Sequence, residues 1–155
     1  MAPVFDFSDS DSKKRLFIES AKKGDVFRKH LTEKEGIKGK NPKDDGRNKF
    51  FVFIGFDSDY NILGCLMINS HINQNLSYEV KLLHYPIAQN KHPFLTHNSH
   101  IDCSKIHRIS LDSFIDKFNY TAEGNISEND YRYTIEAVKS SSTIMPAELK
   151  MFGLL

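Results

Sequence analysis

The stretch Lys49–Ser70, KFFVFIGFDSDYNILGCLMINS, decides the fold. It holds two apolar runs, Phe50–Phe56 and Ile62–Ile68, on either side of the polar turn Asp57–Asn61. Both runs are short and rich in β-branched and aromatic residues, which predicts the two strands of a hairpin. Neither run alternates cleanly between apolar and polar residues, so we expect both faces of the hairpin to be buried.

The hairpin also predicts where a functional site would lie. Gly55 and Gly64 fall inside the strands, where a bulge or a sharp bend is the usual reason for glycine. Arg47 comes just before the first strand, and the second strand ends on Asn69 and Ser70. Because antiparallel pairing brings these two chain positions to one edge of the sheet, we take that edge as the candidate site.

The rest of the chain predicts more short strands, with helices near the two ends. Residues 1–9 are expected to be loosely held, and residues 32–48 to form a long polar loop. Strands are expected over Asp25–Leu31, Tyr78–Tyr85 and Ser99–Ser110, the last with a kink at Ser104-Lys105. Helices are expected from Ser10 or Ser12 to about Lys23, from Ser127 to about Lys139 and from Pro146 onward, whereas Leu111–Tyr120 fits either state. This pattern predicts a mainly-β or α+β fold, a small curled sheet or partial barrel with packed helices.

The length and composition fit a single domain over residues 1–155. The net charge is only +1, but residues 22–49 hold ten Lys and Arg against five Asp and Glu. This segment suits either a loop that faces a polyanion or an ordinary solvated loop. Cys65 and Cys103 lie in apolar runs without zinc-ligand spacing, which predicts buried free thiols. No signal peptide or membrane span is evident, so we expect a cytoplasmic protein.

Four pieces of the chain, taken in order, resemble the MazF/PemK family of toxin endoribonucleases. They are Gly24-Asp25-Val26-Phe27, the loop that ends in Gly46-Arg47 before Phe50–Ile54, the strand Leu66–Ser70, and the segments 101–109 and 124–130. The likeness covers a core of about residues 24–142. It departs from the family where Asn48 and Lys49 follow the arginine in place of the usual proline, and in the extra segments at both ends.

The resemblance implies an SH3-like barrel that cleaves single-stranded RNA without a metal or other cofactor. It gives Arg47 the role of stabilising charge on the phosphoryl oxygens and Ser70 that of orienting the reacting groups, with Asn69 or His71 assisting. Contacts with the RNA would come from Lys38, Lys40, Lys43, Lys49 and His71. The family also implies a homodimer and a protein antitoxin that covers the RNA groove.

Two other interpretations remain open at this point. His92, His97, His100 and His107 crowd one region, and His100 shares a strand face with Asp102, which suits acid–base chemistry or, with His97, a metal-dependent hydrolase. We keep His100 as a further catalytic candidate. A non-catalytic SH3-like barrel that binds protein or nucleic acid would have the same fold and the same basic loop, but no activity.

Overall fold

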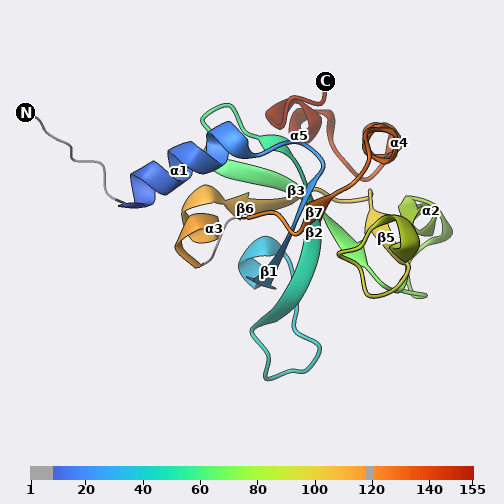
Figure 1. Cartoon of the computed structure of the whole chain (residues 1–155). Coiled ribbons are helices and arrows are strands. Elements are labelled where there is room, and N and C mark those ends of the chain that lie inside the picture. The colour runs from blue at the N-terminus through green and yellow to red at the C-terminus, as the bar shows by residue number, and fades with distance from the viewer. Residues whose placement is uncertain (1–8, 118–120) are drawn as a thin grey trace, which may run out of the picture.

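A computed structural model describes residues 9–117 and 121–155, and its strands form one curled antiparallel sheet (Figure 1). The strands are β1 Asp25–Thr32, β2 Gly46–Phe56, β3 Ile62–Asn69, β4 His84–Ile87, β5 Ser99–Asp102, β6 His107–Ser110 and β7 Gly124–Asn125. They are ordered β4-β5-β3-β2-β1-β7, and β6 pairs with β3 beside β5. The helices are α1 Asp9–Ser20, α2 Tyr78–Lys81, α3 Leu111–Lys117, α4 Glu128–Ser140 and α5 Pro146–Met151, with the short 3₁₀ turns η1 Glu33–Glu35 and η2 Gln89–Lys91. The predicted α+β, barrel-like architecture with helices toward both ends is confirmed.

The β2–β3 hairpin is the centre of the sheet, as the sequence predicted. Its register pairs Phe50 with Ile68 and slips between Phe53 and Gly55, where the φ of Gly55 is 140°. Only glycine adopts that backbone conformation without strain, so the bulge predicted at Gly55 is confirmed. The Asp57 carboxylate fixes the turn, because its Oδ1 accepts hydrogen bonds from the backbone N–H groups of residues 61 and 62.

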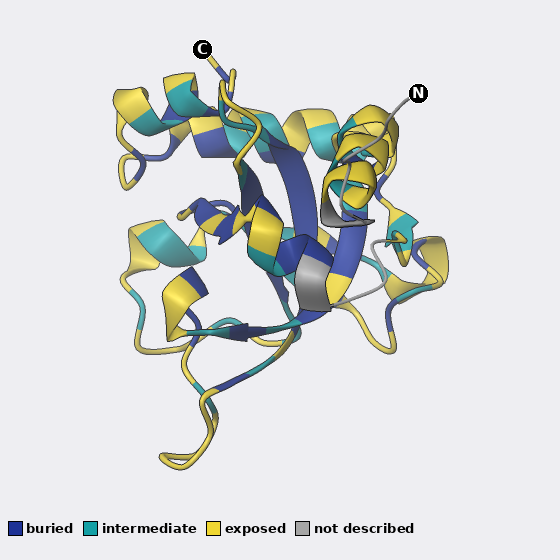
Figure 2. Ribbon diagram, turned by 90° about the vertical axis from the view of Figure 1, so that its left-hand side faces the viewer, coloured by how far each residue is buried: buried dark blue, intermediate teal, exposed yellow. Residues whose placement is uncertain are grey.

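Both faces of the hairpin are buried, each against its own hydrophobic cluster. Val52 and Leu66 point into one cluster, whereas Phe51 and Cys65 point into the other. Figure 2 shows this as long dark-blue ribbon in the middle of the molecule. This confirms the expectation drawn from the lack of clean alternation in the two runs. Cys65 and Cys103 are both buried free thiols, as expected.

Different helices cover the two faces. On the first cluster, α4 contributes Val138 and the segment around α5 contributes Leu149 and Phe152. Phe152 lies directly on the hairpin, because a Cβ built on Gly64 would be 2.7 Å from its ring. On the second cluster, α1 and α3 contribute aromatic rings, and the centroids of Phe17 and Phe114 are 4.7 Å apart.

One predicted strand is wrong. Residues 78–85 begin as helix α2, and the pairing to β5 starts only at His84. The Ser77 Oγ accepts a hydrogen bond from the backbone N–H of Val80, which satisfies a free donor at the helix start and competes with an extended chain. Pro86 lies in β4 at an edge of the sheet, where its missing N–H costs no ladder bond.

β2 begins at Gly46 and not at Phe50, so the polar loop predicted over residues 32–48 is shorter than expected and includes η1. Several other predicted boundaries hold closely. The kink at 104–105 separates β5 from β6, Ser127 caps α4, and Pro146 starts α5. The ambiguous stretch from Leu111 is helical to Lys117, and its remainder, residues 118–120, lies outside the described residues, as do residues 1–8. No helix within 9–117 and 121–155 is long and apolar enough to cross a membrane.

Candidate nucleic-acid interface

A pocket of about 330 Å³ lies at the end of the hairpin opposite its turn, where β2 begins and β3 ends. The segment 95–99, which leads into β5, forms its other wall. Among the described residues, four cationic side chains line the pocket and no carboxylate does. The lining residues are Arg28, Lys40, Arg47, Asn48, Lys49, Phe50, Ile68, Ser70, Leu95, Thr96, His97 and Ser99. Such a concave, positively charged lining with hydroxyl groups suits a phosphate-bearing ligand.

Arg47 is a cation of this pocket with a buried hydrogen-bond donor that has no acceptor in the described residues. It is the second residue of β2, half-buried and paired in register with Leu31. Its Nε is buried and has no hydrogen-bond partner within the described residues. A buried N–H without an acceptor is uncommon, and a guanidinium suits two oxygens of one phosphate. The predicted catalytic arginine is therefore in a pocket that would accept an anion.

Ser70 lines the same pocket as Arg47, as the sequence argument required, but from the other face of the sheet. The register pairs Phe50 with Ile68, so residues 48, 50, 68 and 70 share one face, and Arg47 and Lys49 share the opposite one. Side chains from opposite faces of the sheet can line one pocket here because the pocket lies at the strand ends. On the Ser70 face, the Arg28 guanidinium lies 5.6 Å from the centroid of the Phe50 ring.

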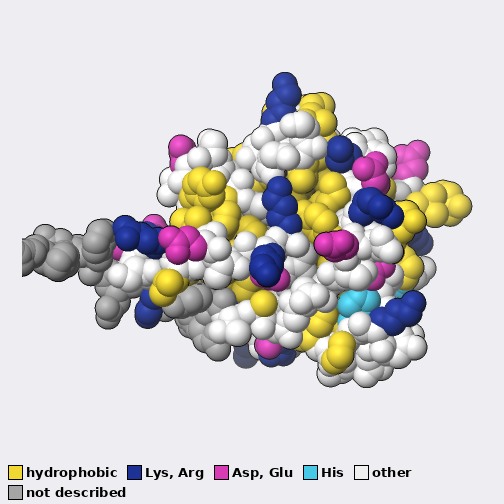
Figure 3. Space-filling view, turned by 45° about the horizontal axis from the view of Figure 1, so that its top comes forward, with side chains coloured by type: hydrophobic (Ala, Val, Ile, Leu, Met, Phe, Trp, Pro, Cys, Tyr) yellow, Lys and Arg dark blue, Asp and Glu magenta, His cyan; other side chains and the backbone are white. Residues whose placement is uncertain are grey.

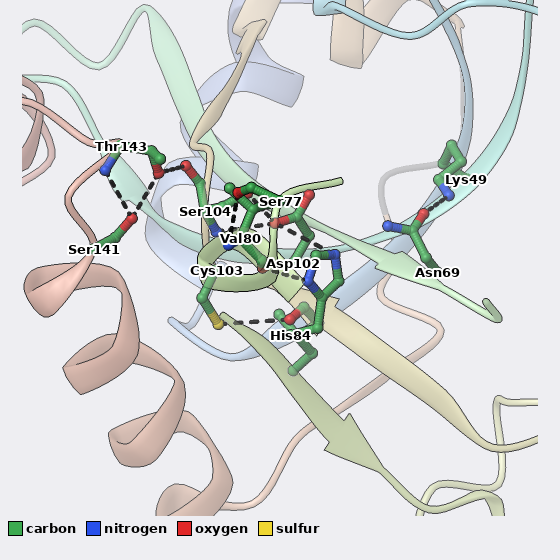
Figure 4. A network of polar contacts seen from close by, with 11 residues as sticks. Lys49, Asn69, Ser77, Val80, His84, Asp102, Cys103, Ser104, Ser141 and Thr143 are labelled. Carbon is green, nitrogen blue, oxygen red and sulfur yellow. Dashed lines mark hydrogen bonds and ion pairs between the residues drawn. The ribbon is translucent and has the colours of Figure 1, made fainter. Parts of the chain in front are cut away.

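Lys49 is a buried lysine, and its chemistry is set by its neighbours. Its Nζ donates a hydrogen bond to Oδ1 of Asn69 on the adjacent strand (Figure 4). Burial, reinforced by the nearby charges of Arg47 and Lys40, lowers the pKa of Lys49 to about 8, although Asp102 opposes the shift. Lys49 therefore belongs to a crowded cationic cluster that lacks a counter-charge in the pocket lining.

A second buried lysine lies directly opposite the first. Lys29 on β1 pairs in register with Lys49 on β2, but neither charge is among those that shift the pKa of the other. Burial lowers the pKa of Lys29 to about 8, with Glu123 opposing the shift. The Lys29 ammonium lies 4.9 Å from the centroid of the Phe114 ring, which offsets part of this cost. Sequence reasoning missed Lys29, although it is in strand phase with the buried Phe27 and Leu31.

Asn69 and His100, two further catalytic candidates, are neighbours across β3 and β5 but do not line the pocket. Asn69 is occupied by Lys49. The His100 Nδ1 is buried without a partner in the described chain, and burial, with smaller contributions from His84 and His71, lowers the pKa of His100. His71 is exposed beyond the end of β3. Direct participation of Asn69 and His100 in chemistry at Arg47 is thus not favoured by this geometry.

The predicted loop lysines divide into two groups. Lys38, Lys40 and Lys43 are all exposed on the loop that projects away from the C-terminal helices in Figure 1. Only Lys40 lines the pocket. Lys38 and Lys43 lie outside the pocket, where a long polyanion that extends beyond it would pass.

His107, one of the four crowded histidines, and His84, which was not among them, make hydrogen bonds to the backbone. His84 donates from Nδ1 to the backbone carbonyl of Val80, and its Nε2 lies 3.8 Å from Oδ1 of Asp102, which also accepts from Ser104 (Figure 4). His107 donates in the same way to the carbonyl of Glu35, and burial lowers the pKa of His107. In residues 9–117 and 121–155 no group of three or more His, Cys, Asp and Glu side chains is arranged to hold a metal ion.

Comparisons with known proteins assign no family: no family model matches the sequence, and no curated protein is significantly similar to it. The likeness to MazF/PemK toxins rests on the residue pattern alone. The activity of this site is therefore argued from its own geometry.

Proposed function

We propose that the chain is a metal-independent endoribonuclease that cleaves single-stranded RNA at the pocket between the start of β2 and the end of β3. The observation that carries the proposal is that Arg47 and Ser70 line one pocket. Within the part of the chain that the structure describes, the Arg47 Nε is buried without a partner and no carboxylate lines the pocket. A phosphodiester supplies what this pocket lacks, an anionic acceptor with several oxygens.

The proposed reaction needs only groups that the chain and the RNA provide. The ribose 2′-oxygen attacks the neighbouring phosphorus, the bond from phosphorus to the 5′-oxygen breaks, and a 2′,3′-cyclic phosphate and a 5′-hydroxyl result. Arg47 would stabilise the charge that builds on the phosphoryl oxygens, and the Ser70 hydroxyl would orient the phosphate. The proton of the 2′-hydroxyl must reach the 5′-oxygen, and the pocket-lining imidazole of His97 is the group suited to carry it.

The biological setting proposed here follows the family likeness. The chain would act in the cytoplasm as a homodimeric toxin, and a protein antitoxin would cover the RNA groove. An acidic segment of the antitoxin would bind to the same cationic side chains as the RNA. Neither partner is needed for the chemistry proposed at the pocket, so the activity can be tested on the chain alone.

A second candidate, phosphate binding without cleavage, is favoured by one specific observation. Arg47 and Ser70 belong to opposite faces of the sheet, whereas Arg47 shares its face with Lys49. A site of that kind would hold the RNA backbone through cations on either side without aligning a 2′-oxygen for attack. This candidate keeps every cationic contact and predicts no reaction.

The deciding experiment is incubation of a long RNA with the chain in excess EDTA. We expect cleavage to persist in EDTA, to fall by about 10²–10³-fold in Arg47→Ala, and to fall in Ser70→Ala. Arg132→Ala, which removes an exposed arginine on α4, is the matched control and should cleave like the wild type. RNA binding that needs Arg47, without cleavage products, would establish the second candidate. Cleavage that EDTA abolishes would overturn both and favour a metal-dependent hydrolase.

A further inference from the structure

A second pocket, of about 400 Å³, lies at the turn end of the hairpin, away from the cationic pocket. Three parts of the chain enclose it: the end of α1 with the residues after it, the β2–β3 turn, and the segment around α5. Its volume falls in the range of pockets that hold small molecules. The lining residues are Ile18, Ala21, Lys23, Phe53, Gly55, Phe56, Asp57, Ser58, Tyr60, Lys150, Met151, Phe152 and Gly153.

The floor of this pocket is apolar and firmly packed. Phe53 and Phe152 are almost fully buried beneath it, and the centroids of Phe53 and Phe56 are 4.8 Å apart. Tyr60 extends the aromatic row from the turn, with its ring centroid 5.4 Å from that of Phe56. At Gly55 an added Cβ would lie 3.1 Å from the Phe152 carbonyl oxygen, so the hollow is kept clear of a side chain at this point. An apolar ligand would therefore meet a preformed surface.

Two lysines give this apolar pocket a positive charge. Lys23 and Lys150 both line it, and neither makes an ion pair within the described residues. The Lys23 stem crosses the floor, since its Cε would be 3.5 Å from a Cβ on Gly55. Asp57 is the one carboxylate that the described residues contribute to the lining, and its Oδ1 already accepts hydrogen bonds from the backbone of the turn. Figure 3, which brings the end with α5 toward the viewer, shows hydrophobic side chains gathered there with Lys and Arg at their borders.

We propose that this pocket binds a small amphipathic carboxylate, a medium-chain fatty acid, with its acyl chain on the aromatic floor and its carboxylate between Lys23 and Lys150. Burial of the chain supplies the apolar part of the binding free energy, and the two ammonium groups select the anionic head. This inference does not rest on the proposed nuclease activity, because the two pockets lie at opposite ends of the hairpin.

The test is titration of the ¹⁵N-labelled chain with decanoate, followed by NMR, at concentrations below those at which decanoate forms micelles. We expect saturable shifts confined to the ends of α1 and α5 and to the β2–β3 turn. Decan-1-ol, which has the same chain without the charge, should bind about tenfold more weakly, and decyltrimethylammonium more weakly still. Lys23→Ala/Lys150→Ala should lose the preference for decanoate over decan-1-ol, whereas Lys91→Ala, at an exposed lysine on η2, should keep it.

A second variant separates loss of the site from loss of the fold. Ala21→Trp places an indole in the pocket, and we expect it to abolish the decanoate shifts while the amide spectrum of residues distant from the pocket stays that of the wild type. Equal binding of decan-1-ol and decanoate, shifts scattered over the whole molecule, or unchanged binding in both variants would each overturn the proposal. Formation of a dimer that closes the pocket in place of decanoate binding would overturn it as well.

Discussion

Replacement of Lys49 by methionine tests the central electrostatic feature of the candidate site. Methionine keeps an unbranched chain in the sheet and removes the buried ammonium. The pKa of Lys49 falls from 10.5 to about 8 on folding, so at neutral pH the folded chain bears a charge that its surroundings disfavour. Lowering the pKa from 10.5 to about 8 corresponds to roughly 3 kcal/mol of destabilisation. The Asn69 hydrogen bond lost in the variant offsets about 1–2 kcal/mol of that gain.

The sign of the pH dependence follows from the direction of the shift. Between pH 8 and 10.5 the unfolded chain keeps a proton on Lys49 that the folded chain releases, so the stability of the wild type rises with pH. The destabilising contribution of Lys49 is fully present below pH 8 and is relieved as the pH approaches 10.5. Between pH 7 and 9.5 the relief amounts to about 2 kcal/mol.

The assay is urea unfolding of wild type and Lys49→Met at several pH values from 7 to 9.5. Other groups also titrate in this window, since burial raises the pKa of Cys103 to about 12 and lowers that of Lys29 to about 8. Subtracting the free energy of unfolding of the variant from that of the wild type cancels these contributions. We expect this difference to start negative at pH 7 and to rise by about 2 kcal/mol by pH 9.5.

Lys91→Met, which removes an exposed lysine on η2, is the control and should give a difference that does not change with pH. A flat difference for Lys49→Met would mean that water solvates this ammonium in the folded chain. The account of Lys49 as a buried member of the cationic pocket would then be wrong.

Three further predictions concern the loop, the packing of α5 and the hairpin turn. Lys40→Ala should reduce the slope of log Kd against log salt for single-stranded RNA by about 0.7, because Lys40 lines the cationic pocket, whereas a larger effect from Lys43→Ala would refute that assignment. Gly64→Val should lower the free energy of unfolding in urea by about 1–3 kcal/mol, because its side chain would collide with the ring of Phe152, and an unchanged midpoint would contradict that contact. Asp57→Ala should cost about 1–3 kcal/mol, because two backbone N–H groups of the turn lose their acceptor, and thermal unfolding by circular dichroism with no loss would contradict it.

The hairpin could be predicted from the sequence because several local signals agreed there. Apolar runs, turn formers and the glycine at position 55 all favour the same structure, and burial on both faces follows from the absence of alternation. The strand predicted from Tyr78 was wrong because the local signals in that stretch disagree with one another. Its β-branched and aromatic residues suit a strand, but Ser77 caps a helical turn locally, and only the last residues find a strand partner in β5.

The candidate site was predictable in outline and not in detail. Antiparallel pairing required Arg47 and Ser70 to approach one end of the hairpin, and both line one pocket. Which face each side chain takes depends on the register, and a register cannot be read from the hairpin sequence without its bulge. Lys49 is in strand phase with the buried Phe51, which favours burial of its side chain. Lysine is so seldom buried, however, that the residue type alone predicts an exposed side chain.

The cost of this cationic cluster is itself an argument for where an anion binds. A chain under selection for stability alone would not bury the ammonium of Lys49 in the sheet, nor leave the Nε of Arg47 buried without an acceptor in the described residues. A bound phosphate would reverse each of these penalties, since it supplies the missing acceptor and raises the pKa of Lys49 toward its ordinary value. If RNA binds there as proposed, the same linkage requires that its binding near pH 8 takes up protons and stabilises the fold. Unfavourable burial of charge and of an unsatisfied donor at one end of the hairpin, beside a well-packed core, is the pattern expected of a binding site rather than of a structural element.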